Sequence, residues 1–154
     1  AFDSTTAMEK LKVLADLQIH SIEQPILAKQ WDKMKDLCAK TPVPIALDEE
    51  LIGVKLYAEK EALLKTIHPQ YIILKPSLIV GIKSCNEWIK IAEENNVGWW
   101  ATSALEGNVG LSAIAQFAFQ TGNQMPQGLG TGQLFETNFE TPILLEGNTV
   151  VFKK

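Results

Sequence analysis

The sequence predicts an α/β fold in which short buried strands alternate with longer amphipathic helices. Three observations support this prediction. Apolar, often β-branched residues form short runs, the segments between them repeat apolar residues at helical spacing, and polar residues follow the strands at intervals of 25 to 28 residues. The chain has 154 residues, 46% of them hydrophobic, which fits one compact domain over 1–154.

The expected elements follow one another in a regular order. A helix over about residues 4–17 places Met8, Leu11 and Leu14 on one face. Four strand–helix units and a last β-rich run follow, with these expected bounds: strand 19–24, helix 28–40, strand 44–47, helix 54–66, strand 71–75, helix 83–95, strand 97–101, helix 109–121, Gly-rich segment 128–132 and β-rich run 143–152. Such alternation predicts parallel strands with right-handed crossovers, in a closed barrel or an open doubly wound sheet.

Composition narrows the classes of function. The net charge is −4 and the lysines are scattered, so we expect no nucleic-acid partner and no anionic membrane surface. No apolar stretch approaches the ~20 residues that span a bilayer. Cys38 and Cys85 lack the paired spacing of zinc sites and are expected to be small buried hydrophobes, as in a cytoplasmic protein.

Two acidic residues stand at equivalent strand ends. Glu23 ends the first strand and Asp48 follows the second. Because parallel strands gather their carboxyl ends at one face, the two carboxylates are expected close together. Two neighbouring anions need compensation, and Mg²⁺ binds a few carboxylates while keeping waters in its shell. The alternative interpretation is that both are solvated residues at the starts of loops.

Lys75 ends the third strand, after the apolar run Tyr71–Leu74. An ammonium group at the end of a buried strand needs either a carboxylate partner or a function. Two interpretations stay open from the local sequence. Lys75 takes part in acid/base chemistry beside a metal, or it forms a structural ion pair with Asp48 or another acid.

Two further loops could bind an anionic substrate. Ser103, Gly107 and Asn108 lie where a strand leads into a helix, and backbone N–H groups at a helix start attract carboxylates. The glycine-rich loop with Gly130 and Thr131 would allow a second close backbone approach. A plain turn is the alternative interpretation of this loop.

Four ordered segments resemble the enolase superfamily. They are Ser21–Ile26, Ile45–Glu49, Leu74–Ser77 and Thr102–Leu111. Within that superfamily they are most similar to the muconate-lactonizing branch, and there to the o-succinylbenzoate synthase family of menaquinone biosynthesis. The resemblance implies a modified TIM barrel of the (β/α)7β type. This chain would be its C-terminal part, incomplete, without the N-terminal capping domain and the first barrel strands.

The resemblance also implies roles for the polar residues. Glu23 matches the second ligand and Asp48 the third ligand of Mg²⁺, for which Mn²⁺ is the alternative ion, and Lys75 matches a catalytic lysine that stabilises the intermediate. The implied lyase removes a proton next to a carboxylate of a small dicarboxylate substrate, stabilises an ene-diolate with the metal, and loses hydroxide. The residues implied in binding the substrate's carboxylate are Ser103, Gly107, Asn108, Gly130 and Thr131.

The sequence also departs from the family pattern. The family's first metal ligand would precede Ala1, and no K-x-K motif lies on a predicted strand. The chain alone would then hold two of three ligands and one of two lysines, so we expect it to be inactive alone. Uncovered barrel edges would favour self-association.

Two other functions stay open at this point. An N-acylamino acid racemase or dipeptide epimerase would use the same scaffold, although the segment Gly128–Gly132 lacks the D-x-D pair of the epimerases. A non-catalytic α/β binding module is the alternative from a different class.

Overall fold

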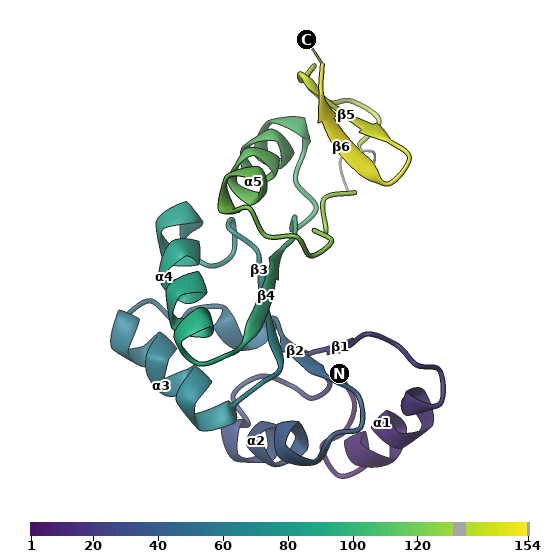
Figure 1. Cartoon of the computed structure of the whole chain (residues 1–154), viewed down its shortest axis with the longest axis vertical. Coiled ribbons are helices and arrows are strands. Elements are labelled where there is room, and N and C mark those ends of the chain that lie inside the picture. Colours follow the sequence, from purple (N-terminus) through teal and green to yellow (C-terminus); the bar gives the residue numbers. More distant parts are fainter. Residues whose placement is uncertain (131–134, 154) are drawn as a thin grey trace. The chain divides into compact units, whose positions relative to one another are not determined.

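A computed structural model of the chain describes residues 1–130 and 135–153 (Figure 1). Helices and strands alternate as expected as far as α5, and two antiparallel strands follow. The bounds are α1 Ala7–Ala15, β1 Ile22–Glu23, α2 Trp31–Lys40, β2 Ile45–Leu47, the 3₁₀ helix η1 Glu49–Leu51, α3 Tyr57–Ile67, β3 Tyr71–Leu74, α4 Gly81–Glu94, β4 Gly98–Ala101, α5 Asn108–Thr121, β5 Ile143–Glu146 and β6 Thr149–Phe152.

The strands β1, β2, β3 and β4 form one sheet in that order. β1 pairs with β2 in parallel, with Ile22 opposite Ile45 and Glu23 opposite Ala46. β2 pairs with β3 in parallel as well. Each of these pairs is joined by a helix, as parallel strands require. The parallel pairing predicted from the alternation of strands and helices is therefore confirmed.

The first strand is shorter than the predicted range 19–24. The backbone of Gln24 has a φ of +36°, and that of Gln18 has a φ of +51°. Extended strands need negative φ values, so neither residue can continue β1. The strand keeps only Ile22 and Glu23, and the chain turns sharply immediately after Glu23.

The described chain divides into two compact units. The first consists of Ala1–Ile73 and Asn86–Trp99, and the second of Leu74–Cys85 and Trp100–Lys154. In the first unit α2 packs against α3, and a single apolar core lies under the helices. The side chains that fill this core with almost no exposure include Leu11, Ile26, Met34, Ile45, Leu47, Leu63, Leu64, Ile67, Ile72 and Trp88.

One charged side chain lies inside the helix layer of the first unit. Lys60 on α3 is fully buried, and its Nζ lies 2.8 Å from the carboxylate of Glu87 on α4. The same Nζ lies 5.6 Å from the centroid of the Trp88 ring, within cation–π range. A buried ammonium needs such partners, because desolvation strongly disfavours an unpaired charge. This ion pair therefore ties α3 to α4.

The second unit contains α5 and a β-hairpin. α5 buries Leu111, Ile114 and Phe117, and Gly122 ends it in the left-handed conformation with φ +68°. The hairpin pairs β5 with β6 in antiparallel fashion (Figure 1), and a two-residue turn with Gly147 at φ +62° joins them. The β-rich run expected over 143–152 is confirmed as this hairpin.

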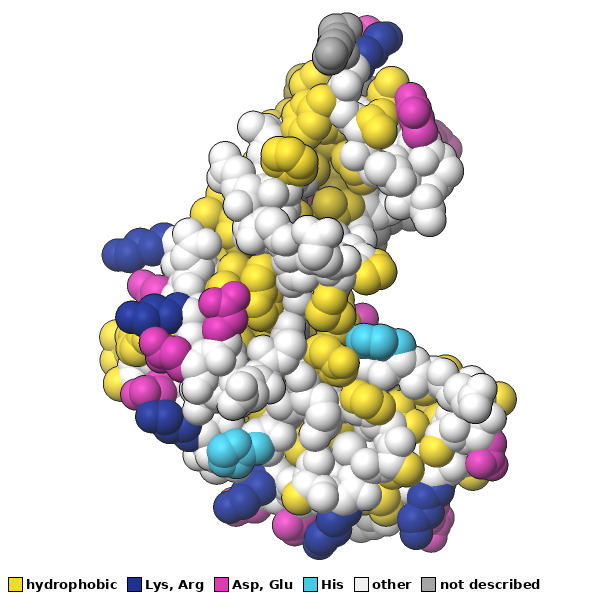
Figure 2. All heavy atoms as spheres, viewed as in Figure 1, with side chains coloured by type: hydrophobic (Ala, Val, Ile, Leu, Met, Phe, Trp, Pro, Cys, Tyr) yellow, Lys and Arg dark blue, Asp and Glu magenta, His cyan; other side chains and the backbone are white. Residues whose placement is uncertain are grey.

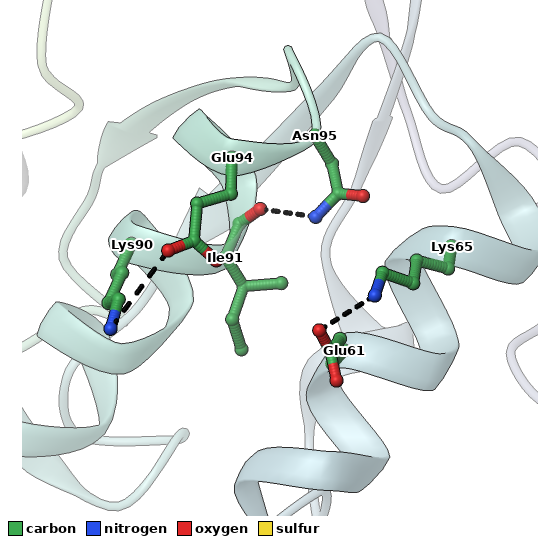
Figure 3. A network of polar contacts seen from close by, with 6 residues as sticks. All are labelled: Glu61, Lys65, Lys90, Ile91, Glu94 and Asn95. Atoms are coloured by element: carbon green, nitrogen blue, oxygen red, sulfur yellow. Dashed lines mark hydrogen bonds and ion pairs between the residues drawn. The ribbon is translucent and has the colours of Figure 1, made fainter.

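The outer helix faces of the first unit carry exposed charge pairs. Figure 3 shows Lys65 bonded to Glu61 at 2.7 Å, Lys90 beside Glu94 at 3.9 Å, and the Asn95 amide bonded to a carbonyl one turn earlier. Side chains of both signs are mixed over this unit in Figure 2. Exposed pairs of this kind contribute little to stability. In the described part of the chain, no helix is long and apolar enough to cross a membrane.

Candidate active site

Glu23 is held at the end of β1 by backbone hydrogen bonds of the residues immediately before and after it. The N–H of Ile22 donates to the carbonyl of Pro44 at 2.9 Å, and the N–H of Gln24 donates to the carbonyl of Ala46 at 2.9 Å. The Glu23 side chain is exposed. A carboxylate on a fixed backbone, open to solvent, can bind a cation or a substrate.

Asp48 directly follows β2, whose three residues are all buried. Only 5% of Asp48 is exposed, and its N–H donates to the side-chain Oε1 of Gln24 at 3.2 Å. Since β1 and β2 are parallel neighbours, Glu23 and Asp48 lie at the same edge of this strand pair. The structure therefore brings together the ends of the strands that carry the two expected metal ligands.

A buried amide and a buried carboxylate join the loops after β1 and β2. Oε1 of Gln24 accepts the N–H groups of Asp48 and Glu50, and its Nε2 donates to the carbonyl of Ile26 at 3.0 Å and to the Glu50 carboxylate at 3.1 Å. The other Glu50 oxygen accepts the N–H of Lys29 at 2.7 Å. We refer to Gln24, Glu50 and these bonds as the Gln24–Glu50 clamp.

The clamp holds a costly backbone conformation. Gln24 and Lys29 have φ values of +36° and +69°. A left-handed conformation costs a residue with a side chain about 1–2 kcal/mol. It persists where surrounding contacts determine it, and such positions are concentrated at functional sites. The clamp supplies those contacts directly beside Glu23.

Lys75 belongs to the second unit, whereas Glu23 and Asp48 belong to the first. It follows β3, whose last three residues are buried as expected, and it is itself half-buried. Its carbonyl accepts the N–H groups of Leu78 at 2.8 Å and Ile79 at 3.1 Å, which fixes the turn after the strand. Lys75 is thus anchored through its backbone at a strand end.

Ser103 lies after β4, beside the glycine loop. It is buried, and its N–H donates to the carbonyl of Gly128 at 3.0 Å. The Thr102 hydroxyl donates to the same carbonyl at 2.7 Å, and a Cβ on Gly128 would lie 2.3 Å from that hydroxyl oxygen. Gly128 is required for this close approach. Gly130 is exposed nearby, and Thr131 lies outside the described residues.

Glu106 joins the two loops that follow β3 and β4. Its carboxylate accepts a hydrogen bond from the hydroxyl of Ser77 and another from the N–H of Ala104, the latter at 2.6 Å. Leu105 beside it has a φ of +64°. Glu106 therefore links two strand-end loops of the second unit through its carboxylate, as Glu50 does in the first unit.

The start of α5 is capped by a distant residue. Gly107 precedes the helix and has no side chain to cap it, and Oδ1 of Asn138 accepts the N–H of Asn108 at 2.9 Å. The Asn108 amide in turn donates to the carbonyl of Phe139 at 2.6 Å. A cavity of about 770 Å³ opens beside this helix start, and its lining includes Asn108, Leu129, Gly130 and Lys153. The N–H of Asn108, at a residue expected to bind the substrate, thus already donates to Asn138.

Sequence reasoning did not assign roles to Gln24, Glu50, Glu106 or Asn138. In the run Asp48–Glu49–Glu50, nothing in the sequence indicates that Glu50 turns inward while Glu49 stays exposed. The partners of Asn108 and Gln24 lie 30 and 26 residues away, beyond any local signal. The position of Gln24 directly after a predicted ligand is a sequence signal that could have drawn attention to it.

The described residues contain no group of three or more His, Cys, Asp or Glu that could hold a metal. Both cysteines are buried, as expected. Burial raises the pKa of Cys38 to about 12, so its thiol is protonated and a poor nucleophile.

Known proteins resemble this chain in sequence and in fold. A family model described as enolase C-terminal domain-like matches residues 1–151. The chain is 50% identical to an o-succinylbenzoate synthase from Desulfotalea psychrophila over 96% of the chain and 40% of that relative. It matches the crystal structure of MenC from the same organism with a TM-score of 0.93 and 48% identity, covering 97% of this chain and 42% of that one.

A more distant structure also matches. The muconate lactonizing enzyme from Pseudomonas fluorescens in complex with muconolactone has a TM-score of 0.77 and 27% identity, over 93% of this chain and 37% of that one. The chain thus spans about two fifths of the length of the proteins that it resembles. The predicted resemblance and the fold class, part of a TIM-like α/β barrel, are confirmed. The chain therefore belongs to the enolase C-terminal domain-like family.

Proposed function

We propose that this chain supplies part of the active site of a cytoplasmic o-succinylbenzoate synthase. This lyase forms o-succinylbenzoate by removing a proton and a hydroxide, as water, from a dicarboxylate precursor. The observation that carries the proposal is the parallel pairing of β1 and β2, which puts Glu23 and Asp48 at one edge. A relative with this activity in its name is 50% identical to the chain.

Glu23 and Asp48 fit a hard divalent cation. Mg²⁺ takes oxygen ligands and is commonly held by one or two carboxylates, with waters or substrate oxygens completing its shell. Mn²⁺ accepts the same ligands. Bound there, the ion would supply positive charge to a carboxylate of the substrate. The exposed Glu23 and the buried Asp48 would hold the ion from two neighbouring strands.

The second unit, taken by itself, carries the other residues to which the proposal gives a role. The Lys75 ammonium would stabilise negative charge that develops on the substrate as its proton leaves. Ser103 and the start of α5 at Gly107 and Asn108 would receive the second carboxylate, with Gly130 beside them. A carboxylate that bonds to the N–H of Asn108 would have to replace Oδ1 of Asn138.

We further propose that the chain alone binds Mg²⁺ weakly and does not complete the reaction, because the family pattern assigns only two of its three carboxylate ligands, Glu23 and Asp48, to this sequence. Calorimetric titration with Mg²⁺, followed by o-succinylbenzoate, tests the assignment. We expect Glu23→Gln and Asp48→Asn each to abolish Mg²⁺ binding. Glu49→Gln, which changes an exposed acid next to Asp48, is the matched control and should leave binding intact.

Two outcomes would contradict this proposal. Mg²⁺ binding that survives both ligand substitutions would place the ion elsewhere. Turnover by the chain alone, followed by the absorbance of the aromatic product, would refute the claim that the site is incomplete. Lys75→Ala should weaken binding of o-succinylbenzoate, because it removes the ammonium group that the proposal places against the ligand's negative charge. Thermal unfolding checks that the variant still folds.

A further inference from the structure

The Gln24 side chain uses its hydrogen-bonding groups on two loops at once. Gln24 is only 6% exposed, and its Oε1 accepts N–H groups from Asp48 at 3.2 Å and Glu50 at 3.4 Å. Its Nε2 donates to the carbonyl of Ile26 and to the Glu50 carboxylate. One amide therefore bonds the residue after Glu23 to the backbone of Asp48.

The Glu50 carboxylate completes this arrangement. It is 4% exposed and accepts Nε2 of Gln24 at 3.1 Å and the N–H of Lys29 at 2.7 Å. A buried carboxylate is tolerated when hydrogen-bond donors surround it. Its two oxygens are bonded to the loop after β1, so Glu50 fastens that loop to η1, which begins immediately after Asp48.

These contacts matter because the two proposed ligands repel each other. Two carboxylates that bind the same cation repel each other electrostatically, so holding them in place before the cation binds has a cost. Gln24 adopts a φ of +36°, a conformation that persists only where contacts hold it. Without the clamp, the turn after Glu23 would relax and the backbone of Asp48 would lose its bond to Gln24.

We propose that Gln24 and Glu50 are positioning residues that hold Glu23 and Asp48 ready for a divalent cation. This inference rests on the proposed function, in which Glu23 and Asp48 are the ligands. Outer residues that orient metal ligands typically contribute 10- to 100-fold to metal affinity. The Gln24 amide bonds to the carbonyl of Ile26, in the loop after Glu23, and to the N–H of Asp48. One amide therefore restrains the backbone at both proposed ligands.

The pattern of donors and acceptors makes a specific prediction about isosteric changes. Glu50→Gln keeps only one acceptor oxygen, so its new NH2 group would face one of two donors, Nε2 of Gln24 or the N–H of Lys29, and Gln24→Glu would set two carboxylates against each other. The reciprocal double variant, Gln24→Glu with Glu50→Gln, restores one donor and one acceptor. We therefore expect each single variant to weaken cation binding and the double variant to recover part of it.

The test compares Gln24→Ala with Gln70→Ala in the full chain. Gln70 is a matched control because its amide also bonds two backbone groups of the first unit, the N–H of Ile45 at the start of β2 and the carbonyl of Cys38 in α2. Mg²⁺ affinity is measured by calorimetry. Exchange of the Asp48 amide hydrogen is measured by NMR without metal, and thermal unfolding is recorded for both variants.

We expect Gln24→Ala to weaken Mg²⁺ binding at least tenfold and to speed exchange at Asp48 at least tenfold. Gln70→Ala should lower the unfolding temperature but change affinity and exchange less than twofold. Equal effects of the two variants, or no rescue in the reciprocal swap, would overturn the inference. If the wild-type chain binds no Mg²⁺, the metal assignment itself fails. Asp48 exchange that is equal in the two variants then refutes the clamp, and exchange faster only in Gln24→Ala supports it.

Discussion

Two glutamines bridge the strands of the first unit at opposite ends, and they differ in what they hold. Gln24 follows β1 and bonds to the loop after β2, at the carboxyl ends of the strands. Gln70 precedes β3 and bonds to Ile45 at the start of β2 and to Cys38 in α2. Both satisfy backbone groups that neighbouring elements leave unpaired. Only Gln24 lies next to the two proposed ligands.

Glutamine bridges also occur away from the proposed ligands, where they join segments of the chain. A third glutamine, Gln127 in the second unit, also accepts a strand N–H, that of Ala101 at 2.8 Å, and donates to the carbonyl of Met125. An amide bridge is thus a recurrent solution for joining a strand to the next segment. At Gln24 the same chemistry is combined with a buried carboxylate and a left-handed backbone. These added features occur at the carboxyl ends of the strands, where the two proposed ligands lie.

The largest effect on stability is expected from Glu50→Ala. This change removes a buried acceptor and leaves Nε2 of Gln24 and the N–H of Lys29 without it. Each hydrogen bond to a charged group contributes about 1.5–3 kcal/mol, so we expect the free energy of unfolding to fall by about 3 kcal/mol in urea denaturation. Glu49→Ala, an exposed neighbour, is the control. A loss below about 1 kcal/mol would mean that Glu50 does not hold the loops.

Gln70→Ala should have a smaller effect. It leaves the N–H of Ile45 and the carbonyl of Cys38 without their side-chain partner, which costs about 1–2 kcal/mol. Urea denaturation measures this loss, with Gln30→Ala as a control because Gln30 makes an exposed bond of the same type. A stability loss larger than that of Glu50→Ala would mean that the bonds at the amino ends of the strands stabilise the fold more than those at the carboxyl ends, contrary to the prediction.

The thiol of Cys38 reports on the amino ends of the strands. Burial raises its pKa to about 12, so at neutral pH the thiolate is about a thousandfold rarer than for an ordinary thiol and alkylation is slow. Alkylation should speed up as the pH rises toward that pKa. In a Cys85→Ala background, Gln70→Ala should accelerate iodoacetamide labelling severalfold, and Gln24→Ala should not. Equal acceleration would show that the two bridges are not independent.

The smallest effect is expected on the exposed helix faces. The hydrogen bond from Lys65 to Glu61 (Figure 3) raises the pKa of Lys65, yet the Lys65 side chain is 57% exposed and that of Glu61 is 39% exposed. Solvent and salt screen such pairs. Lys65→Ala should leave the unfolding temperature unchanged within error, and also the Mg²⁺ affinity. A clear drop in the unfolding temperature would mean that this exposed ion pair contributes measurably to stability, contrary to the prediction.

The sequence alone was sufficient to predict the parallel strands and the positions of Glu23, Asp48 and Lys75 at their ends. Periodicity depends on burial, which is local to each element, so the helices and strands could be placed. The length of β1 could not, because the left-handed turn at Gln24 depends on partners 24 and 26 residues away. The Asn138 cap on α5 was missed for the same reason.

The site itself was predicted as residues rather than as an arrangement. Ser103 and the glycine-rich loop were each named as substrate-binding candidates, but the bond at 3.0 Å from the Ser103 N–H to the Gly128 carbonyl was not predicted. The bonds of Glu106 to Ser77 and Ala104 depend on which acid of a polar loop turns inward. That choice follows from packing in three dimensions and leaves no periodic signal in the chain.

The central claim is that Glu23 and Asp48 together hold a divalent cation at the edge of β1 and β2. Titration of the chain with Mn²⁺, followed by paramagnetic broadening of backbone amide resonances, tests it directly. We predict that the resonances of Glu23, Gln24, Asp48 and Glu49 broaden first and together, and that Asp48→Asn abolishes this broadening. Broadening that begins elsewhere, or that persists unchanged in Asp48→Asn, would contradict the account.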